Sequence, residues 1–353
     1  MAMGTRKPEE QGSFWVATSD LPTSSAHPFY EAVNRILDGR GFDRFVEGQC
    51  RRFYHERMGR PSLAPAVYFR LLLMGYFEGL DSERGMAWRV SDSLGLRRYL
   101  GYSLTDPTPD HSTISRNRRL IDVETHEAVF VWMLQVLAAE GLLQGKTIGV
   151  DATTLEANAA LKSIVRRDTG EGYQEFLTRL AQESGIATPT REDLARLDKQ
   201  RKNKASNDDW QNPHEPDAKV AKMKDGSTHL AHKAEHAVDM DTGAIVTVTL
   251  QPADRGDPES MAETLPLAGD TLVEVLTEES AGQRMSAQVL AEVVADKGYH
   301  SNGVLTGVGQ VVARTYISEP DRGRRNWSGT TAEETEAKSA AREAVYANRR
   351  RIR

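Results

Sequence analysis

The sequence predicts an α/β protein in which an all-helical N-terminal domain precedes a mixed β-sheet domain. Apolar residues recur with helical period up to about residue 145, and strand-like apolar runs prevail after it. A chain of 353 residues is also about twice the usual length of one domain. We therefore expect a disordered arm over residues 1–27, a helical domain over 28–145 and a sheet domain over 146–353.

The first half of the helical domain is expected to contain three helices. Two short helices fit residues 30–53, because their apolar rhythm is interrupted at Gly39 and Gly41. A third helix is expected to begin with Ser62 as its N-cap and to close at Gly79. Tight turns would then join these helices into one packed unit.

The second half of the helical domain contains capping signals for three more helices. One is expected over residues 82–94, with its start at Ser82. Asp110 is a good N-cap for the helix HSTISRNRRLI, and residues 125–143 form a longer amphipathic helix. Together with the preceding helices, this pattern is typical of a helix-turn-helix-like DNA-binding domain.

Four segments of the sheet domain have the β-branched or apolar runs of strands. They are KTIGVDATTLEA, HLAHKAEHAVDMDTGAIVTVTLQPAD, AQVLAEVVADKGYH and VARTYISEP. The second contains the turn Asp241-Thr242-Gly243 and predicts a hairpin. Helix-like sequence lies between residues 270 and 292, so the order of elements predicts a mixed sheet.

A polar segment over residues 158–227 interrupts this order and is interpreted as an insertion after the first strand. It contains helical patterns over residues 172–180 and 191–197. Its last part, QNPHEPDAKVAKMKDGST, is rich in Pro and Gly and is expected to be a loop.

Composition narrows the possible functions. Cys50 is the only cysteine, which excludes a disulfide framework and thiolate metal clusters and leaves oxygen and imidazole ligands. The 45 Lys and Arg residues face 51 Asp and Glu residues, so nucleic acid could bind only where basic residues are segregated in space. The N-terminus lacks the apolar core of a signal peptide, and no apolar run reaches the length of a membrane span. We expect a cytoplasmic protein.

Two predicted strands end on an aspartate. Asp151 follows the run Thr147–Val150, and Asp296 follows Val293–Ala295. Ligands of α/β sheets bind where loops leave the carboxyl ends of the strands. Two carboxylates on neighbouring strands would form an oxygen-only site for Mg²⁺ or Mn²⁺, suited to attack on a phosphodiester. The alternative is that each aspartate only caps the turn that follows, the commoner role of a single such residue.

Three segments resemble the catalytic core of DDE-type insertion-sequence transposases: VDATTLEANA, HLAHKAEHAVDMDTGAIVTVTLQPADRGDP and VVADKGYHS. RPSLAPAVYFRLLLMGYFEGLDSERG and DHSTISRNRRL resemble the N-terminal helical DNA-binding domain of the same branch. The resemblance runs from about Phe29 to the last residue. It implies a ribonuclease-H-like sheet domain, with Asp151 as the first catalytic acid and Asp296 as the second.

The same resemblance implies a third acid, a Glu on a helix that follows a Tyr/Arg-rich segment near the C-terminus. Residues Tyr346–Arg353 resemble that segment, and the sequence ends before such a helix. We therefore expect a chain truncated at its C-terminus, by a frameshift, a premature stop or the choice of end point. The upstream acids that do not match the family motif are Glu333, Glu334, Glu336 and Glu343.

Residues near the two aspartates are secondary candidates for the site. Phosphate contacts or plain surface-turn positions are alternatives for Lys297, Tyr299 and His300. Asp254 could shape the site or cap the next helix. Zinc binding is disfavoured for the histidines, because they fall on both faces of a predicted strand, and phosphate contacts or hydrogen bonds are preferred for His229, His232 and His236.

Basic residues cluster at three places that could bind DNA. The helix after Asp110 offers side chains that suit base edges and phosphates, with a solvated charged face as the alternative: Arg116, Asn117, Arg118 and Arg119. A second cluster, which contains Arg349, Arg350 and Arg351, would neutralise DNA backbone. The third cluster, Lys199–Lys204, could equally be the polar side of a helix.

The resemblance implies a nucleoid-associated transposase that binds element ends and catalyses DNA cleavage and strand transfer with Mg²⁺ or Mn²⁺. Its partners would be the double-stranded DNA of the element's terminal repeats and of the target, and further copies of the chain in a homodimer or larger assembly. A ribonuclease-H-like nuclease without strand transfer would use the same metal ligands. A catalytically impaired remnant that only binds DNA is the third interpretation, favoured by the missing C-terminal helix.

Overall fold

The computed structural model describes residues 27–55, 62–201, 204–223, 225–320 and 329–347. The chain divides into two compact units, Met1–Val129 and Phe130–Arg353. The division falls inside one long helix, α7 (Val123–Ala139), and so precedes the boundary expected near residue 145. Residues 1–26 of the expected disordered arm lie outside the described ranges.

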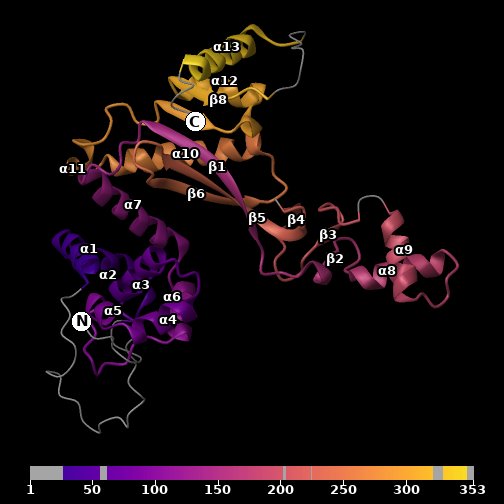
Figure 1. Cartoon of the computed structure of the whole chain (residues 1–353), viewed down its shortest axis with the longest axis horizontal. Helices are drawn as coiled ribbons and strands as arrows, with labels where there is room; N and C mark the ends of the chain where they lie inside the picture. Colours follow the sequence, from indigo (N-terminus) through magenta and orange to yellow (C-terminus); the bar gives the residue numbers. More distant parts are fainter. Residues whose placement is uncertain (1–26, 56–61, 202–203, 224, 321–328, 348–353) are drawn as a thin grey trace, which may run out of the picture. The chain divides into compact units, whose positions relative to one another are not determined.

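The first unit is helical throughout the part that the structure describes (Figure 1). Its remaining elements are α1 (Pro28–Gly39), α2 (Phe42–Cys50), the 3₁₀ helix η2 (Arg51–Phe53), α3 (Pro65–Glu78), α4 (Glu83–Asp92), α5 (Leu94–Tyr99) and α6 (His111–Leu120). The two short helices expected over residues 30–53 are confirmed by α1 and α2. Helix α1 packs with α2 and α5, α2 packs with α3, and α4 packs with α3 and α6. The buried side chains of these helices include Leu37, Val46, Leu71, Met74 and Ile114.

Two helix boundaries of the first unit differ from expectation. Helix α3 begins at Pro65 rather than at Ser62, because proline lacks the N–H that a cap would satisfy and its fixed φ suits the first turn. The helix that Ser82 caps stops before Ser93, whose hydroxyl caps the separate helix α5. The end of α3 at Gly79 is confirmed, with φ of 65° in the left-handed region that glycine tolerates.

The second unit is built on a six-stranded mixed sheet of order β4-β5-β1-β7-β8, with β6 also paired to β5. The strands are β1 (Thr147–Glu156), β4 (Lys219–Lys222), β5 (Thr228–Asp239), β6 (Ile245–Pro252), β7 (Glu292–Ala295) and β8 (Arg314–Ile317). Strand β1 pairs antiparallel with β5 and parallel with β7, and β7 pairs parallel with β8. The α/β fold class, with helices before a mixed sheet, is therefore confirmed.

The described residues of the second unit form five helical segments after the β5–β6 hairpin. They are α10 (Asp257–Val275), α11 (Glu279–Gly282), the 3₁₀ helix η4 (Lys297–Tyr299), α12 (Asn302–Val311) and α13 (Ala332–Ala347). Of these, α10, α12 and α13 pack directly against strands of this sheet. The core under them joins Ile148 and Val150 of β1 to Met261 and Leu265 of α10. Helical sequence was expected only from residue 270 onward, but helix α10 already begins at Asp257. Its N-cap is Gly256, so Asp254 does not cap it.

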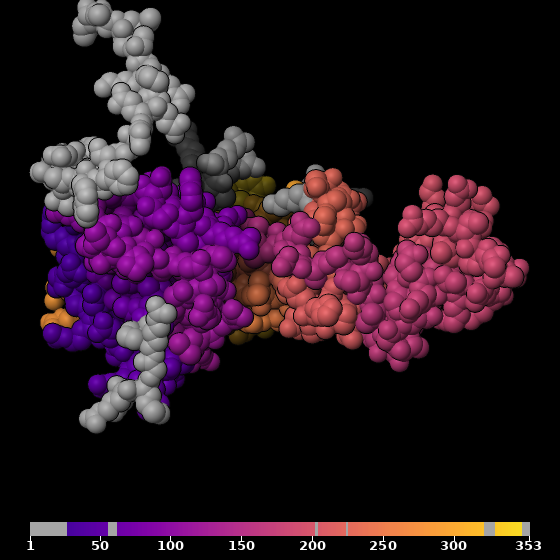
Figure 2. All heavy atoms as spheres, turned by 90° about the horizontal axis from the view of Figure 1, so that it is seen from below, coloured from indigo at the N-terminus to yellow at the C-terminus, as the bar shows by residue number. Residues whose placement is uncertain are grey.

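The insertion after β1 forms a small packed lobe of its own, in rose in Figure 2. It contains the 3₁₀ helix η3 (Leu161–Ser163), β2 (Val165–Arg166), α8 (Tyr173–Glu183), α9 (Arg191–Gln200) and β3 (Trp210–Gln211). The two helices expected there are confirmed. The segment 211–228, expected as a loop, instead includes the end of β3 and all of β4. The buried ring of Trp210 packs against Tyr173 and Phe176 of α8, and this contact fixes β3 against that helix.

Across the described ranges, each helix falls short of the length or the apolar character needed to cross a bilayer.

Candidate functional site

Asp151 and Asp296 occupy neighbouring positions of two adjacent parallel strands, at the point where the pairing of β1 with β7 ends. Asp296 directly follows the end of β7, as expected. The expectation that the first strand also ends on its aspartate is wrong, because β1 continues through Asp151 to Glu156 by pairing with β5. The last paired residues of β1 and β7 are Val150 and Ala295, and each aspartate is the next residue along the chain. Asp296 keeps an extended backbone, with φ of −66° and ψ of 161°. Adjacent strands are about 4.8 Å apart, so the two side chains leave neighbouring backbone positions. Both residues are exposed.

The two aspartates belong to the face of the sheet opposite α10. Val150 is buried in the core under α10, and side chains alternate along a strand, so Asp151 belongs to the other face. On the antiparallel side, the register partner of Asp151 is the half-buried His236 of β5. Three adjacent strands therefore place His236, Asp151 and Asp296 in one row.

Each carboxylate of the pair accepts one local hydrogen bond. The amide of Ala152 donates to Asp151 Oδ1 at 2.8 Å, and the amide of Lys297 donates to Asp296 Oδ1 at 2.6 Å. Neither aspartate forms an ion pair with a described residue. The capping alternative is confirmed for Asp296, whose side chain caps η4, whereas Asp151 lies within β1 and caps no turn. Oδ2 of each carboxylate makes no hydrogen bond to the described part of the chain and is accessible to a ligand.

The donor set of the pair suits a hard cation. Mg²⁺ prefers oxygen ligands and is commonly held by one or two carboxylates together with waters and substrate phosphates. Asp151 and Asp296 would be the protein ligands of one such ion. No group of three or more His, Cys, Asp or Glu side chains within the described ranges could hold a metal ion, so the pair is the whole carboxylate set that the geometry offers.

The other two candidate histidines of β5 are engaged elsewhere. His229 Nδ1 lies 2.6 Å from Glu156 Oε1, and His232 Nε2 lies 2.9 Å from Glu215 Oε1. These partners are carboxylates of neighbouring segments, as the preference for hydrogen bonding over zinc predicted.

Of the three candidates that follow Asp296, Lys297 is the one that is exposed. His300 is half-buried, whereas Tyr299 is 2% exposed and donates a hydrogen bond from its hydroxyl to Glu235 Oε1 at 2.8 Å. Burial and the neighbouring Glu235 carboxylate raise the pKa of Tyr299. A DNA contact by Tyr299 does not fit this place in the fold, because its hydroxyl points into the protein.

Sequence reasoning missed a buried polar network beneath the pair. Glu235 is 0% exposed and accepts hydrogen bonds at Oε1 from Ser260 Oγ at 2.5 Å and from Tyr299. Lys233, two residues earlier on the same face of β5, donates to Asp257 Oδ1 at 2.6 Å and to Ser260 Oγ at 2.9 Å. The sequence signal for this network is the alternation along β5. Lys233 and Glu235 alternate with the same period as Ala231 and Ala237, so all four side chains belong to one face, and that face is buried.

The basic face expected on the helical unit lies on α6. Asp110 caps this helix by accepting from the amide of Ser112, as predicted, and Ile114 packs into the core. The exposed arginines of the helix are Arg116, Arg118 and Arg119. Arg118 forms an ion pair with Glu83 of α4 at 3.0 Å. The guanidinium of Arg116 donates only to Ser112 one turn earlier, so it remains accessible to a ligand.

Asn117 does not lie on that basic face. It is 2% exposed, its Oδ1 accepts from the Tyr54 hydroxyl at 3.0 Å, and its Nδ2 donates to the carbonyl of Thr113 at 2.9 Å. These bonds occupy the amide inside the helical unit. The expected base contact by Asn117 is therefore wrong for this arrangement, because the helix turns that position toward the core.

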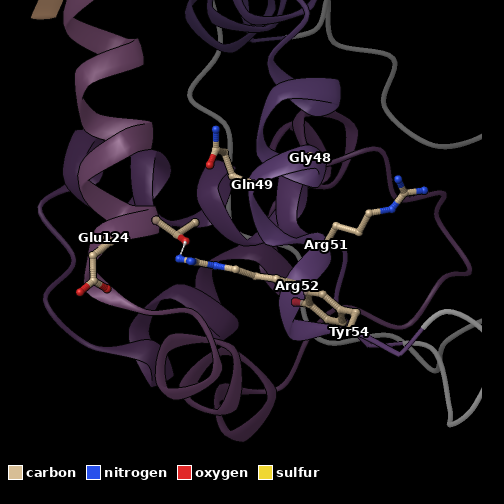
Figure 3. A pocket seen from close by; sticks show the side chains of 7 residues that line it. Gly48, Gln49, Arg51, Arg52, Tyr54 and Glu124 are labelled. Atoms are coloured by element: carbon tan, nitrogen blue, oxygen red, sulfur yellow. Dashed lines mark hydrogen bonds between the residues drawn. The ribbon is translucent and has the colours of Figure 1, made fainter.

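A shallow pocket opens near the end of α2 in the same unit (Figure 3). Arg52 reaches across it to the Thr125 hydroxyl at 3.1 Å and to Asp122 Oδ2 at 2.5 Å, whereas Arg51 points away. Glu124 also lines the pocket. Its one inward arginine is thus already neutralised.

The remaining expected site residues fall in other places. Arg349, Arg350 and Arg351 lie outside the described residues, as do two residues of the tract Lys199–Lys204. On α13, Glu333 accepts from Gln310 and Glu334 accepts from the amide of Thr331, so both serve local structure.

The helical unit matches a known family. Residues 19–120 match the family model described as Transposase domain (DUF772). No curated protein and no solved structure matches the chain. The family match covers α1 to α6 and supports a transposase.

Proposed function

We propose that this protein is a DDE-type transposase whose sheet domain cleaves and joins DNA at Asp151 and Asp296. The single observation that carries the proposal is the placement of these two exposed carboxylates at adjacent positions of parallel strands. A lone aspartate after a strand is ordinarily a turn cap, but two carboxylates on adjacent strands together supply the oxygen ligands that a hard cation prefers.

The architecture around the pair supports a ribonuclease-H-like core. The first strand, β1, is flanked by the antiparallel β5–β6 hairpin on one side and by the parallel strands β7 and β8 on the other. Helices α10 and α12 connect these strands in chain order. Both aspartates thus come from the strands that meet where the antiparallel and parallel parts of the sheet join.

The chemistry follows from what two carboxylates can do. A bound Mg²⁺ or Mn²⁺ would polarise the scissile phosphodiester and favour deprotonation of the attacking water or 3′-hydroxyl. Asp151 and Asp296 would hold that cation and, through it, orient the phosphate for in-line attack. The attacking oxygen forms a new bond to phosphorus, and the bond to the leaving oxygen breaks, so strand transfer conserves the number of phosphodiester bonds.

Recognition of the DNA ends is assigned to the helical unit. Exposed Arg116, Arg118 and Arg119 on α6 would contact phosphates and base edges, and at least two copies of the chain would pair two ends. The family match to this unit supports its place in a transposase.

The test is a plasmid nicking assay with the full chain and Mn²⁺ or Mg²⁺. We expect metal-dependent nicking of supercoiled DNA that falls at least about 100-fold in Asp151→Asn and in Asp296→Asn, since each change removes a ligand charge. Asp241→Asn is the matched control, because Asp241 is an exposed aspartate in the β5–β6 turn at the other end of the sheet. A labelled duplex with a free 3′-hydroxyl, added to the same reaction, tests strand transfer.

The other functions are outcomes of this assay. Nicking without joining of the labelled duplex would indicate a ribonuclease-H-like nuclease. DNA binding without nicking would indicate a DNA-binding protein, which the limited carboxylate set of the described residues favours over the nuclease. Nicking that persists in both aspartate variants would contradict the proposed site.

A further inference from the structure

The segment that carries Asp296 is tied to the rest of the sheet domain at two points. Three residues after Asp296, the Tyr299 hydroxyl donates to Glu235 Oε1 at 2.8 Å on β5. Between them, Gly298 lies against Asp257, because a Cβ added there would come within 2.5 Å of Asp257 Oδ2. The β1–β7 pairing sets the backbone position of Asp296 relative to Asp151 up to Ala295, and this hydrogen bond and this close approach fix the loop that follows.

The tie through Glu235 is completely buried. Glu235 is 0% exposed, and its Oε1 accepts from both Tyr299 and Ser260 of α10. Its Oε2 has no hydrogen-bond partner among the described residues. Burying a carboxylate with one unpaired oxygen costs free energy, and such a group in a folded protein calls for a structural or functional explanation. The backbone of Glu235 pairs with Ala152, the residue next to Asp151, so one strand position connects with both halves of the acid pair.

The tie through Asp257 is held from the same strand. Lys233 donates to Asp257 Oδ1 at 2.6 Å, to Ser260 Oγ at 2.9 Å and to the carbonyl of Arg255 at 3.3 Å. Its side chain is 8% exposed, so the ion pair is shielded from water on the lysine side. Lys233 and Glu235 thus meet at Ser260, and together they fix the start of α10 and the loop after β7.

We infer that Glu235 is a positioning residue, which holds the Asp296 segment through Tyr299 so that the two aspartates can share one cation. This inference rests on the proposed function. Glu235 does not itself bind the ion, because its side chain belongs to the face of the sheet opposite Asp151. Residues that orient ligands from behind commonly change metal affinity by about 10–100-fold when they are replaced.

The test is a titration of the full chain with Mn²⁺, in which binding is measured as the decrease of the electron paramagnetic resonance signal of free Mn²⁺. We expect Tyr299→Phe to weaken binding by about 10-fold, because it removes only the hydroxyl that Glu235 holds. Glu235→Leu should weaken it similarly. Glu235→Gln should stay within about threefold of the wild type, because its amide oxygen can still accept from Tyr299.

The matched control is Tyr316→Phe on β8, since Tyr316 is also buried but its hydroxyl makes no hydrogen bond to a described residue. Gly298→Ala provides a second variant at an exposed position, and we expect it to weaken Mn²⁺ binding through the clash with Asp257. Circular dichroism establishes that each variant is folded. If Tyr299→Phe does not fold, the positioning role is tested by the other two variants. It predicts weakened Mn²⁺ binding in Gly298→Ala and nearly wild-type binding in Glu235→Gln.

The outcomes separate this inference from the proposed function. Wild-type binding that is lost in Asp151→Asn but unchanged in folded Tyr299→Phe and Gly298→Ala overturns the positioning role alone. Mn²⁺ binding by Glu235→Gln that is as weak as binding by Tyr299→Phe would also overturn the positioning role, because the charge of Glu235 and not its hydrogen bond to Tyr299 would then determine the affinity. Wild-type binding that Asp151→Asn does not change overturns both.

Discussion

The Tyr54 hydroxyl donates a hydrogen bond to Asn117 Oδ1 at 3.0 Å. Tyr54 directly follows η2, and Asn117 lies on the buried side of α6. This bond identifies the face of α6 that packs against the rest of the helical unit. Asn117 and Ile114 face the protein, whereas the arginines of the helix are exposed. The residues of one helix thus divide into those that hold the unit together and those that remain accessible to DNA.

Replacing Asn117 should therefore affect stability before it affects DNA binding. Asn117→Ala removes the hydrogen bond from the Tyr54 hydroxyl and the bond to the carbonyl of Thr113. We expect the free energy of unfolding to fall by about 1–3 kcal/mol, the usual net contribution of two hydrogen bonds. Urea denaturation measures it, and Arg116→Ala should change stability by less than about 0.5 kcal/mol. Equal effects of the two changes would contradict the division of faces.

The salt dependence of DNA binding tests the exposed face of α6. Each phosphate contact contributes about one unit to the slope of log affinity against log salt concentration. The double variant Arg116→Ala with Arg119→Ala should therefore flatten the slope by about two units. Arg196→Ala on α9 is the control, because that side chain is 74% exposed but lies in the insertion. An unchanged slope in the double variant would place the DNA surface elsewhere.

The ion pair of Lys233 and Asp257 should respond unequally to removal of its two members. The Lys233 side chain is 8% exposed and the Asp257 side chain 42%. Asp257→Ala leaves a buried ammonium without its carboxylate and should cost about 3–5 kcal/mol. Lys233→Met leaves a carboxylate that water can reach and should cost only about 1–2 kcal/mol. Urea denaturation of both variants measures the difference, and the reverse order would show that Asp257 is the buried partner.

Cys50 should be unreactive in the folded protein. It is 0% exposed, and burial raises the pKa of its thiol to about 11. At pH 8 the folded chain then holds roughly a thousandth of this group as thiolate. We expect modification by a thiol reagent at pH 8 to be at least about 100-fold slower in buffer than in urea. Since the chain has one cysteine, the rate reports on the helical unit alone. Rapid reaction of the folded chain would contradict the burial of Cys50.

Local patterns in the sequence predicted most of the helices and strands. Asp110 and Ser82 are caps whose side chains accept a backbone N–H a few residues on, so the signal and the structure are the same interaction. The end of β7 before Asp296 was equally visible, because an apolar run stops there. The same signal was wrong at Asp151, because pairing with β5 carries β1 on to Glu156. What periodicity predicts well is the type of an element and its buried face.

The parts that sequence reasoning missed depend on contacts between distant residues. Asn117 looked like a base-reading side chain until its partner Tyr54, 63 residues earlier, was placed beside it. Glu235 and Tyr299 are 64 residues apart, and nothing local to either indicates that they meet. Long-range pairing of this kind is set by the register of the sheet and by helix packing, which local patterns do not specify.

The measurement that tests the central claim most directly is the position of Mn²⁺ in crystals of the full chain soaked with MnCl₂, located by anomalous scattering. The account predicts one anomalous peak within coordination distance of a carboxylate oxygen of both Asp151 and Asp296, and its absence from crystals of Asp296→Asn. A peak bound to neither aspartate, or one that persists unchanged in Asp296→Asn, would contradict the claim that these two residues form a shared cation site.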